Sequence, residues 1–129
     1  MHQTINHILI ANRGEIAYRI IRTARRMGIR TLAVYSDADA RLPYVAAADR
    51  AIRLPGSAAA DTYLQQDRLI EIARQYEVDA IHPGYGFLAE QAAFAKKCAV
   101  LKPAGPAPMI ATASDMINLL FYSNLRLIN

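Results

Sequence analysis

Short apolar runs and longer amphipathic segments alternate along the first hundred residues of the chain. The apolar runs have the length of strands, and their near-continuous hydrophobicity is typical of strands buried on both faces. They occupy residues 8–11, 31–35, 51–54 and 78–81. The segments between them carry apolar residues at helical spacing. Strands that alternate with helices predict a parallel sheet with right-handed crossover connections.

The clearest helical segment spans residues 15–27. Glu15 lies in its first turn, and Arg25 and Arg26 lie in its last turn, where the helix dipole favours each charge. Gly28 is well placed to end the helix, because glycine accepts the left-handed conformation found at helix C-termini. The apolar residues predicted to face the core are Ile16, Ala17, Ile20, Ile21, Ala24 and Met27.

Three further helices are expected. Pro43 suits the first turn of a short helix, where its missing N–H leaves no bond unmade. Asp67 is predicted to cap a second helix, which runs to about Tyr76, and a third covers residues 89–97. The predicted buried side of the second helix consists of Leu69, Ile70, Ala73 and Tyr76. The predicted core of the sheet includes Ile8, Ile10, Val34 and Ile81.

The most informative motif is the turn that follows the fourth predicted strand. Residues 82–91 read HPGYGFLAEQ, so Gly84 and Gly86 flank Tyr85. Glycine lets the backbone take unusual dihedral angles and approach a ligand closely. Open α/β sheets bind ligands at the carboxyl ends of their parallel strands. The alternative is a turn that contains these residues without binding anything, and the peptide alone slightly favours that alternative.

A second motif strengthens the functional interpretation. Residues 8–17 read ILIANRGEIA, another strand that runs into a helix. Together the two motifs resemble the biotin carboxylase family, in which ANRGEIA is followed later in the chain by HPGYGFLSEN. This chain has Ala89 and Gln91 where the family usually has serine and asparagine. Further landmarks in the family's order are VYSDADA (34–40), VAAAD (45–49) and DTYL (61–64), so the resemblance covers roughly residues 6–97.

The resemblance implies an α/β fold, a Rossmann-like (pre-ATP-grasp) domain of three layers with a mainly parallel sheet flanked by helices. The domain is expected to span residues 1–106, followed by a divergent tail at 107–129, with the ATP-grasp domains absent. The implied parent enzyme is an ATP-dependent ligase within an acyl-CoA carboxylase. This enzyme would use ATP to activate bicarbonate, which forms carboxyphosphate, and would then carboxylate biotin.

The resemblance also implies roles for particular residues. Tyr85, Gly86 and Glu90 are expected to face the biotin and bicarbonate region, where this domain would form one wall of the pocket. Tyr85 fits packing against a neighbouring domain equally well. Glu90 also fits a simple first-turn carboxylate on a helix that begins near residue 89, which the helix dipole alone would favour. Arg19 and Arg22 are expected at a dimer contact.

The cofactors implied for the parent enzyme are biotin, ATP and Mg²⁺, and the implied partners are a second copy, other carboxylase domains and the biotin carboxyl carrier domain. None of the cofactors is expected to bind tightly to this chain alone. The turn after the first strand has only Gly14, whereas the dinucleotide fingerprint needs three glycines, and Glu15 would lie beside the phosphates. Met116 stands near a lysine position of the family. With no catalytic set and no metal ligands expected, the chain is predicted to be catalytically incompetent by itself.

Two features leave alternatives open. His82 is a tempting general base, but a histidine in a His-Pro-Gly turn at a strand end favours a structural role. Residues 117–129 are rich in apolar side chains and do not resemble the family. They are predicted to cover exposed apolar surface or to drive self-association, and an altered reading frame is a third explanation of their sequence.

The composition is ordinary for a globular protein, with 53% hydrophobic and 20% charged residues. No apolar run is long enough to span a bilayer, and residues 1–6 lack the pattern of a signal peptide. Cys98 is the only cysteine, which fits a packing residue in a reducing compartment. A cytoplasmic location without membrane contact is therefore expected.

The net charge is +4, and arginines gather in and just after the first helix. Because no aromatic platform or nucleic-acid motif accompanies them, they indicate a solvated face or a protein interface and no nucleic-acid partner. Two other classes of function stay open. One is a non-enzymatic interaction module that docks through Arg19 and Arg22, and the other is a small Rossmann-like nucleotide-binding domain. The missing glycine fingerprint counts against the second.

Overall fold

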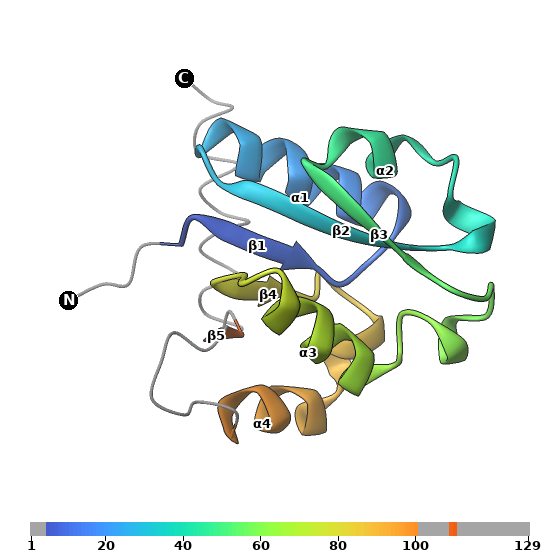
Figure 1. Ribbon diagram of the computed structural model, residues 1–129, viewed down its shortest axis with the longest axis vertical. Helices are drawn as coiled ribbons and strands as arrows, with labels where there is room; N and C mark the ends of the chain where they lie inside the picture. Colours follow the sequence, from blue (N-terminus) through green and yellow to red (C-terminus); the bar gives the residue numbers. More distant parts are fainter. Residues whose placement is uncertain (1–4, 101–108, 111–129) are drawn as a thin grey trace.

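The computed structural model describes residues 5–100 and 109–110 of the chain. Its centre is a parallel sheet of five strands in the order β3-β2-β1-β4-β5 (Figure 1). The apolar runs predict the first four strands with slightly shifted ends, whereas β5 is not among the predicted strands. The strands are β1 (His7–Ile10), β2 (Arg30–Ser36), β3 (Arg50–Leu54), β4 (Ala80–His82) and β5 (Met109–Ile110).

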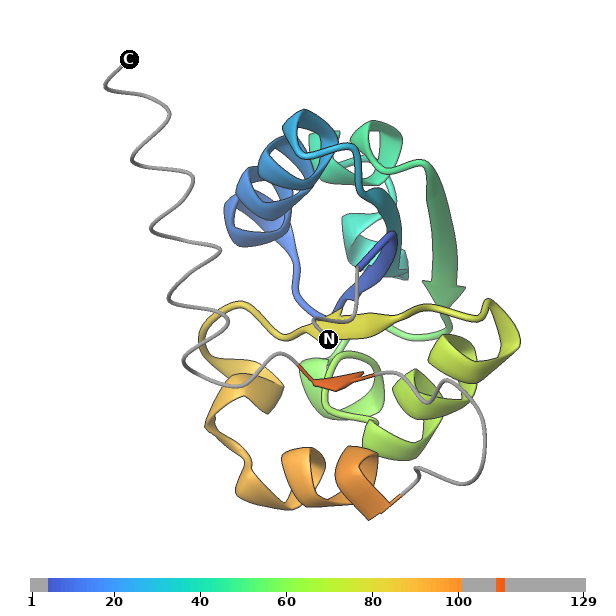
Figure 2. The same ribbon diagram turned by 90° about the vertical axis from the view of Figure 1, so that its left-hand side faces the viewer.

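Helices cover both faces of the sheet, which gives three layers (Figure 2). On one face lie α1 (Gly14–Arg26) and α2 (Pro43–Ala47), and on the other lie α3 (Gln66–Gln75) and α4 (Ala92–Val100). Three short 3₁₀ turns each lie between a strand and the helix that follows it: η1 (Asp37–Asp39), η2 (Ala59–Asp61) and η3 (Phe87–Glu90). The predicted α/β class, with a parallel sheet flanked by helices, is confirmed.

Strands β1 to β4 contribute to two hydrophobic cores, because successive side chains of a strand point to opposite faces of the sheet. Leu9 packs with residues of α3 and α4, whereas Ile8 and Ile10 pack with residues of α1 and α2. Ile10 lies beside Ala33 of β2 and His82 of β4. The prediction of a buried core is confirmed, since none of the four named residues is more than 2% exposed: Ile8, Ile10, Val34 and Ile81.

Helix α1 follows the sequence pattern except at its last predicted core residue. Its buried residues are Ala17, Ile20, Ile21 and Ala24. Gly28 ends the helix as predicted, with φ +74° and a backbone N–H that donates to the carbonyl of Arg25. Met27 is 45% exposed, so its assignment to the buried side is wrong. Met27 is the C-cap that follows the last helical residue, Arg26, and Ile29 is the next buried apolar residue along the chain.

The starts of two other helices also differ from prediction. Helix α3 begins at Gln66 with no side-chain cap, and Asp67 lies in its first turn, where its carboxylate pairs with Lys97 at 3.1 Å. The chain after β4 forms the 3₁₀ turn η3 before α4 begins at Ala92. Glu90 therefore ends η3 and does not lie in the first turn of a helix, because the extended backbone of Gln91 separates the two segments.

Part of the sequence prediction lies outside the described residues. This holds for Met116, for residues 117–129 and for most of the proposed tail at 107–129, and also for the side chain of Cys98. Among the residues that are described, no helix is both long and apolar enough to cross a membrane.

Substituting Ile10 by aspartate should prevent folding. Ile10 is fully buried in the central strand β1, and an unpaired carboxylate there would lose its hydration without gaining a partner. Arg30→Asp is the matched control, because it places the same group on an exposed position of the neighbouring strand β2. Circular dichroism melting should show a cooperative transition for the control only. A soluble, cooperatively melting Ile10→Asp variant would contradict the assignment of β1.

Candidate functional site

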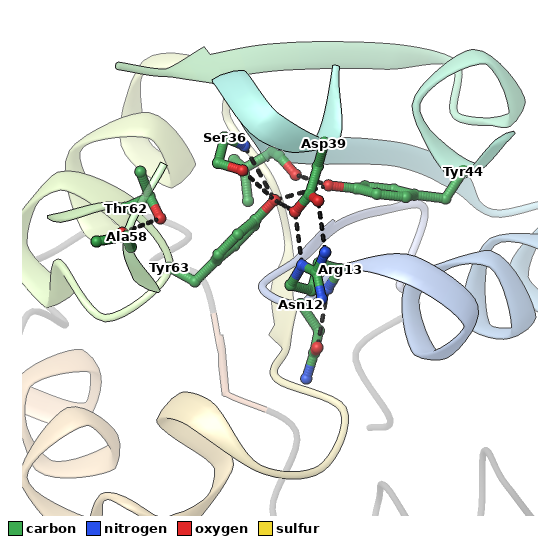
Figure 3. Close-up of polar contacts among 9 residues, drawn as sticks. Asn12, Arg13, Ser36, Asp39, Tyr44, Ala58, Thr62 and Tyr63 are labelled. Carbon is green, nitrogen blue, oxygen red and sulfur yellow. Dashed lines mark hydrogen bonds and ion pairs between the residues drawn. The ribbon is translucent and has the colours of Figure 1, made fainter. Parts of the chain in front are cut away.

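Three segments that follow strands meet at the carboxyl edge of the sheet, where the strand order reverses between β1 and β4. Figure 3 shows Asn12, Arg13 and Asp39, which come from two of these segments. Asn12 and Arg13 follow β1, residues 83–87 follow β4, and Asp39 ends the η1 turn after β2. Open α/β sheets bind ligands in the crevice outside such a reversal. This edge is therefore the candidate functional site.

Asn12 joins the ends of the two central strands. It is fully buried, and its Nδ2 donates hydrogen bonds to the carbonyl oxygens of Pro83 (2.9 Å) and Tyr85 (2.8 Å). Its Oδ1 accepts a hydrogen bond from the backbone N–H of Arg13 (2.8 Å), which orients the amide. Because an unsatisfied buried polar group costs about 1–3 kcal/mol, this amide holds the turn after β4 in one place.

Arg13 forms a bidentate ion pair with a buried carboxylate. Its Nε lies 2.6 Å from Asp39 Oδ2, and its Nη2 lies 2.5 Å from Asp39 Oδ1. Asp39 is 3% exposed, whereas the side chain of Arg13 is 44% exposed. The hydrogen bonds from Arg13 lower the pKa of Asp39 to about 2, although desolvation opposes them. The carboxylate is therefore charged at neutral pH despite its burial.

Two buried tyrosines complete the surroundings of Asp39. Tyr63 Oη donates to Asp39 Oδ2 (2.5 Å) and accepts from the backbone N–H of Ser36 (2.9 Å). Tyr44 Oη lies 2.9 Å from Tyr63 Oη and 3.0 Å from the carbonyl oxygen of Val34. Burial raises the pKa of both phenols, and the hydrogen bond to Asp39 raises that of Tyr63 further. Both hydroxyls therefore keep their protons at neutral pH.

The ring of Tyr63 reaches the turn after β4. It stacks on the ring of Phe87 with centroids 5.4 Å apart and planes inclined by 10°. Phe87 has φ +44°, a left-handed conformation that costs a residue with a side chain about 1–2 kcal/mol. Aromatic pairs stabilise by about 0.5–1.5 kcal/mol beyond their area burial, so the stack offsets much of this strain.

Gly84 lies where the turn passes closest to β1 and α1. It has φ +66°, and a Cβ atom at this position would lie 2.8 Å from Ile16 Cγ2 and 2.9 Å from Asn12 Nδ2. Real Cβ atoms essentially never approach other atoms so closely. The turn therefore requires glycine here for two reasons, backbone conformation and space.

His82 supports the same turn from its start. It is 3% exposed, and its Nδ1 accepts a hydrogen bond from the backbone N–H of Gly84 (3.0 Å). Burial lowers the pKa of His82 to about 4, so the imidazole is neutral at neutral pH. An accepting Nδ1 in a neutral ring is consistent with the structural role that the sequence favours.

The three predicted pocket residues lie on or beside this turn. Tyr85 is 68% exposed although its carbonyl is bound by Asn12. Gly86 has φ +69°, and a Cβ atom built there would meet no atom within 4 Å. Glu90 is exposed at the end of η3. The edge thus presents an aromatic ring, an open stretch of backbone and a carboxylate close together in the sequence.

The two predicted interface residues lie elsewhere in the domain. Arg19 and Arg22 are exposed on α1, and the guanidinium carbon of Arg22 lies 5.8 Å from the centre of the Tyr18 ring. They belong to a helix that packs on one face of the sheet and not to the turn after β4.

The predicted site residues do not include Asn12, Arg13, Asp39 or Tyr63. All four lie inside the sequence motifs that carry the family resemblance. ANRGEIA contains the first two, VYSDADA contains Asp39 and DTYL contains Tyr63. The available signal was that each polar group lies just beyond a strand or in the connection that follows one. Their mutual contacts join positions far apart in the sequence and could not be obtained from residue spacing.

The described residues do not fit ATP with Mg²⁺. No group of three or more His, Cys, Asp or Glu residues converges among them to hold a metal ion. At the start of α1, the Arg13 guanidinium is engaged by Asp39, and Glu15 adds a negative charge where a phosphate would bind. What this edge can do chemically is hold a turn rigidly and present its side chains.

The close approach at Gly84 predicts an unequal response to two alanine substitutions. Gly28 also has positive φ, but a Cβ atom there would meet no atom within 4 Å, so Gly28→Ala should cost only about 1–2 kcal/mol of backbone strain. Gly84→Ala should cost about 1–3 kcal/mol more, because it also overpacks Ile16 and Asn12. Urea unfolding of the two variants measures the difference. Equal losses of stability would show that the turn relaxes away from Asn12.

The known proteins described below are similar to this chain over the same region. Residues 4–108 match the family described as "Biotin carboxylase, N-terminal domain". A biotin carboxylase of Halalkalibacterium halodurans is 50% identical over 105 residues, which are 80% of this chain and 23% of that protein. The mitochondrial methylcrotonoyl-CoA carboxylase subunit alpha of Glycine max is 56% identical over 94 residues, which are 73% of this chain and 13% of that protein.

Solved structures agree with these relatives. The biotin carboxylase domain dimer of Hydrogenobacter thermophilus 2-oxoglutarate carboxylase, in complex with MgADP, ADP and bicarbonate, is 43% identical and aligns with a TM-score of 0.72. The match covers 77% of this chain and 22% of that chain. This chain therefore spans less than a quarter of the length of these three relatives. It belongs to the biotin carboxylase N-terminal domain family.

Proposed function

We propose that this domain works within a biotin-dependent acyl-CoA carboxylase, where it forms one wall of the pocket that binds biotin and bicarbonate. The residues of that wall are Tyr85, Gly86 and Glu90. The proposal rests on the turn after β4, which lies where the strand order reverses. Asn12 binds the backbone of this turn, and the Tyr85 side chain is left 68% exposed. An exposed ring on a backbone that the domain holds in place is suited to contact a ligand.

The relatives support the reaction class. The Hydrogenobacter thermophilus structure contains bicarbonate and MgADP, as expected of an enzyme that activates bicarbonate with ATP. In such a reaction bicarbonate becomes carboxyphosphate, and the carboxyl group then passes to a biotin nitrogen. Since the described residues do not fit ATP or Mg²⁺, other parts of a complete carboxylase would bind both and supply the phosphoryl transfer.

The wall residues offer three different contacts. The Tyr85 ring can pack on the apolar face of the biotin bicycle, and its hydroxyl can donate a hydrogen bond. The backbone at Gly86 can be approached closely, because the space beside its α carbon is empty in this domain. The Glu90 carboxylate can accept a hydrogen bond from a ureido N–H. Together they would bind and orient biotin beside the activated carboxyl group.

A chimera tests the pocket wall directly. Residues 4–108 would replace the matching segment of the Halalkalibacterium halodurans biotin carboxylase, and biotin-dependent ADP release would be measured. The chimera should be active, whereas the 129-residue chain by itself should be inactive. Tyr85→Ala should raise the KM for biotin about tenfold with little change in kcat, as expected for the loss of about 1.4 kcal/mol of uniform binding.

Exposed carboxylates provide the matched control. Glu90→Gln should also raise the KM for biotin, whereas Glu71→Gln on α3, whose side chain is 67% exposed, should not. Unchanged biotin kinetics in both Tyr85→Ala and Glu90→Gln would rule out the proposed wall. An active chimera would in that case leave Tyr85 as a packing contact with the neighbouring domain.

We further propose that Arg19 and Arg22 on α1 contribute to a dimer contact, that a biotin carboxyl carrier domain delivers biotin to the wall, and that the protein is cytoplasmic. The Hydrogenobacter thermophilus relative is a dimer of biotin carboxylase domains, while the Glycine max relative is mitochondrial.

In the chimera, the double substitution Arg19→Glu and Arg22→Glu should shift the native mass toward the monomer in analytical ultracentrifugation. The double substitution Arg68→Glu and Arg74→Glu on α3 is the control. A dimer unaffected by the α1 substitutions would place the contact elsewhere.

A further inference from the structure

We propose that Tyr63 is a positioning residue for the turn at residues 83–87. Its ring holds Phe87, and through Phe87 it sets the orientation of Tyr85 and Gly86. The consequence for biotin binding rests on the proposed function above, whereas the effect of Tyr63 on the turn does not depend on that function.

The turn is held at two separate points. At its start, the amide of Asn12 binds the carbonyl oxygens of Pro83 and Tyr85. At its end, the ring of Phe87 lies 5.4 Å from the ring of Tyr63. Gly86, with its own positive φ, is the joint between the two points. If the stack of Phe87 on Tyr63 is lost, Asn12 still fixes the Tyr85 carbonyl, but it does not fix the peptide planes that follow Tyr85.

The second point has to resist backbone strain. Phe87 is one of only two non-glycine residues with positive φ among those the structure describes, the other being Glu77. A residue with a side chain persists in this conformation only when its surroundings enforce it. Phe87 is partly buried against the core cluster to which Tyr63 belongs, and the stacked rings are the specific contact that enforces its position.

Tyr63 is itself fixed in place, so it can act as a support. It is 1% exposed, and its hydroxyl is bound to the Asp39 carboxylate, to the Ser36 backbone N–H and to the Tyr44 hydroxyl. Asp39 in turn is held by Arg13, the neighbour of Asn12 in the chain. Both supports of the turn therefore lead back to Asn12 and Arg13, in the connection between β1 and α1.

Buried tyrosines that share the network provide a matched pair for the test. Tyr44 and Tyr63 are each 1% exposed and are hydrogen-bonded to one another, but only Tyr63 contacts Phe87. Tyr63→Leu and Tyr44→Leu in the 129-residue chain each remove a buried ring and a hydroxyl from the same hydrogen-bond network. ¹⁵N relaxation then measures the order parameters of the Tyr85 and Gly86 amides.

The expected result separates the two variants. With Tyr63→Leu the order parameters of the two amides should fall from about 0.85 to below about 0.6, the range of flexible backbone, whereas Tyr44→Leu should leave them near the starting value. Tyr63→Phe retains the ring and should retain the order. If Tyr63→Leu does not fold, Phe87→Leu removes the same stack from the other side and should give the same loss of order.

Two outcomes would overturn the proposal: equal loosening in the Tyr44 and Tyr63 variants, or an ordered turn in the variant that lacks the stack. The chimera distinguishes this failure from a failure of the proposed function. Tyr63→Leu should raise the KM for biotin about as much as Tyr85→Ala, and Tyr63→Phe should restore it. If Tyr85→Ala leaves biotin kinetics unchanged while the turn loosens as expected, the pocket wall is wrong and the positioning role stands.

Discussion

The candidate site depends on the side-chain amide of Asn12, which is buried between the ends of β1 and β4. Backbone carbonyls that leave a sheet at its edge lose their ladder partners, and inside a protein they need others. One amide supplies both donors required by Pro83 and Tyr85, while its oxygen takes up the N–H of Arg13. The requirement for glycine at position 84 follows, because the turn that binds this amide passes too close to it for any Cβ atom.

A buried charge extends this local constraint to distant parts of the chain. Asp39 is accessible only at 3% of its surface, and a buried carboxylate without partners would be strongly destabilising. Arg13 and Tyr63 satisfy it from segments on either side in the sequence. Removing Arg13 would leave the charge uncompensated, and removing the Tyr63 hydroxyl would take away one of its hydrogen bonds. The carboxylate thus holds together three connections that follow different strands. The same contact fixes the ring of Tyr63, on which Phe87 rests.

The sequence predicts those parts of the structure that depend on local pattern. Apolar runs identify four strands, and helical spacing identifies α1, because burial of one face is visible in a single segment. Prediction from local pattern fails where a tertiary contact decides. Asp67 pairs with Lys97 and does not cap α3, and the left-handed Phe87 begins η3, so that Glu90 precedes α4. The contact of Tyr63 with Asp39 joins residues 24 positions apart and that of Asn12 with Tyr85 joins residues 73 positions apart, and no periodic pattern encodes them.

The polar groups at this edge are arranged differently from those of a nucleotide-binding sheet of similar topology. There, glycines and helix N–H groups are left free for phosphates. Here Glu15 lies in the first turn of α1, and Arg13 is committed to Asp39. Asn12 is directed at the backbone of the turn, and Arg13 and Asp39 are directed at one another. Among the described residues only Met27 and Tyr85 are large, apolar and exposed, so the network rigidifies a segment whose principal side chain the domain itself does not bury. Such rigidity lowers the entropy lost when that side chain contacts something else.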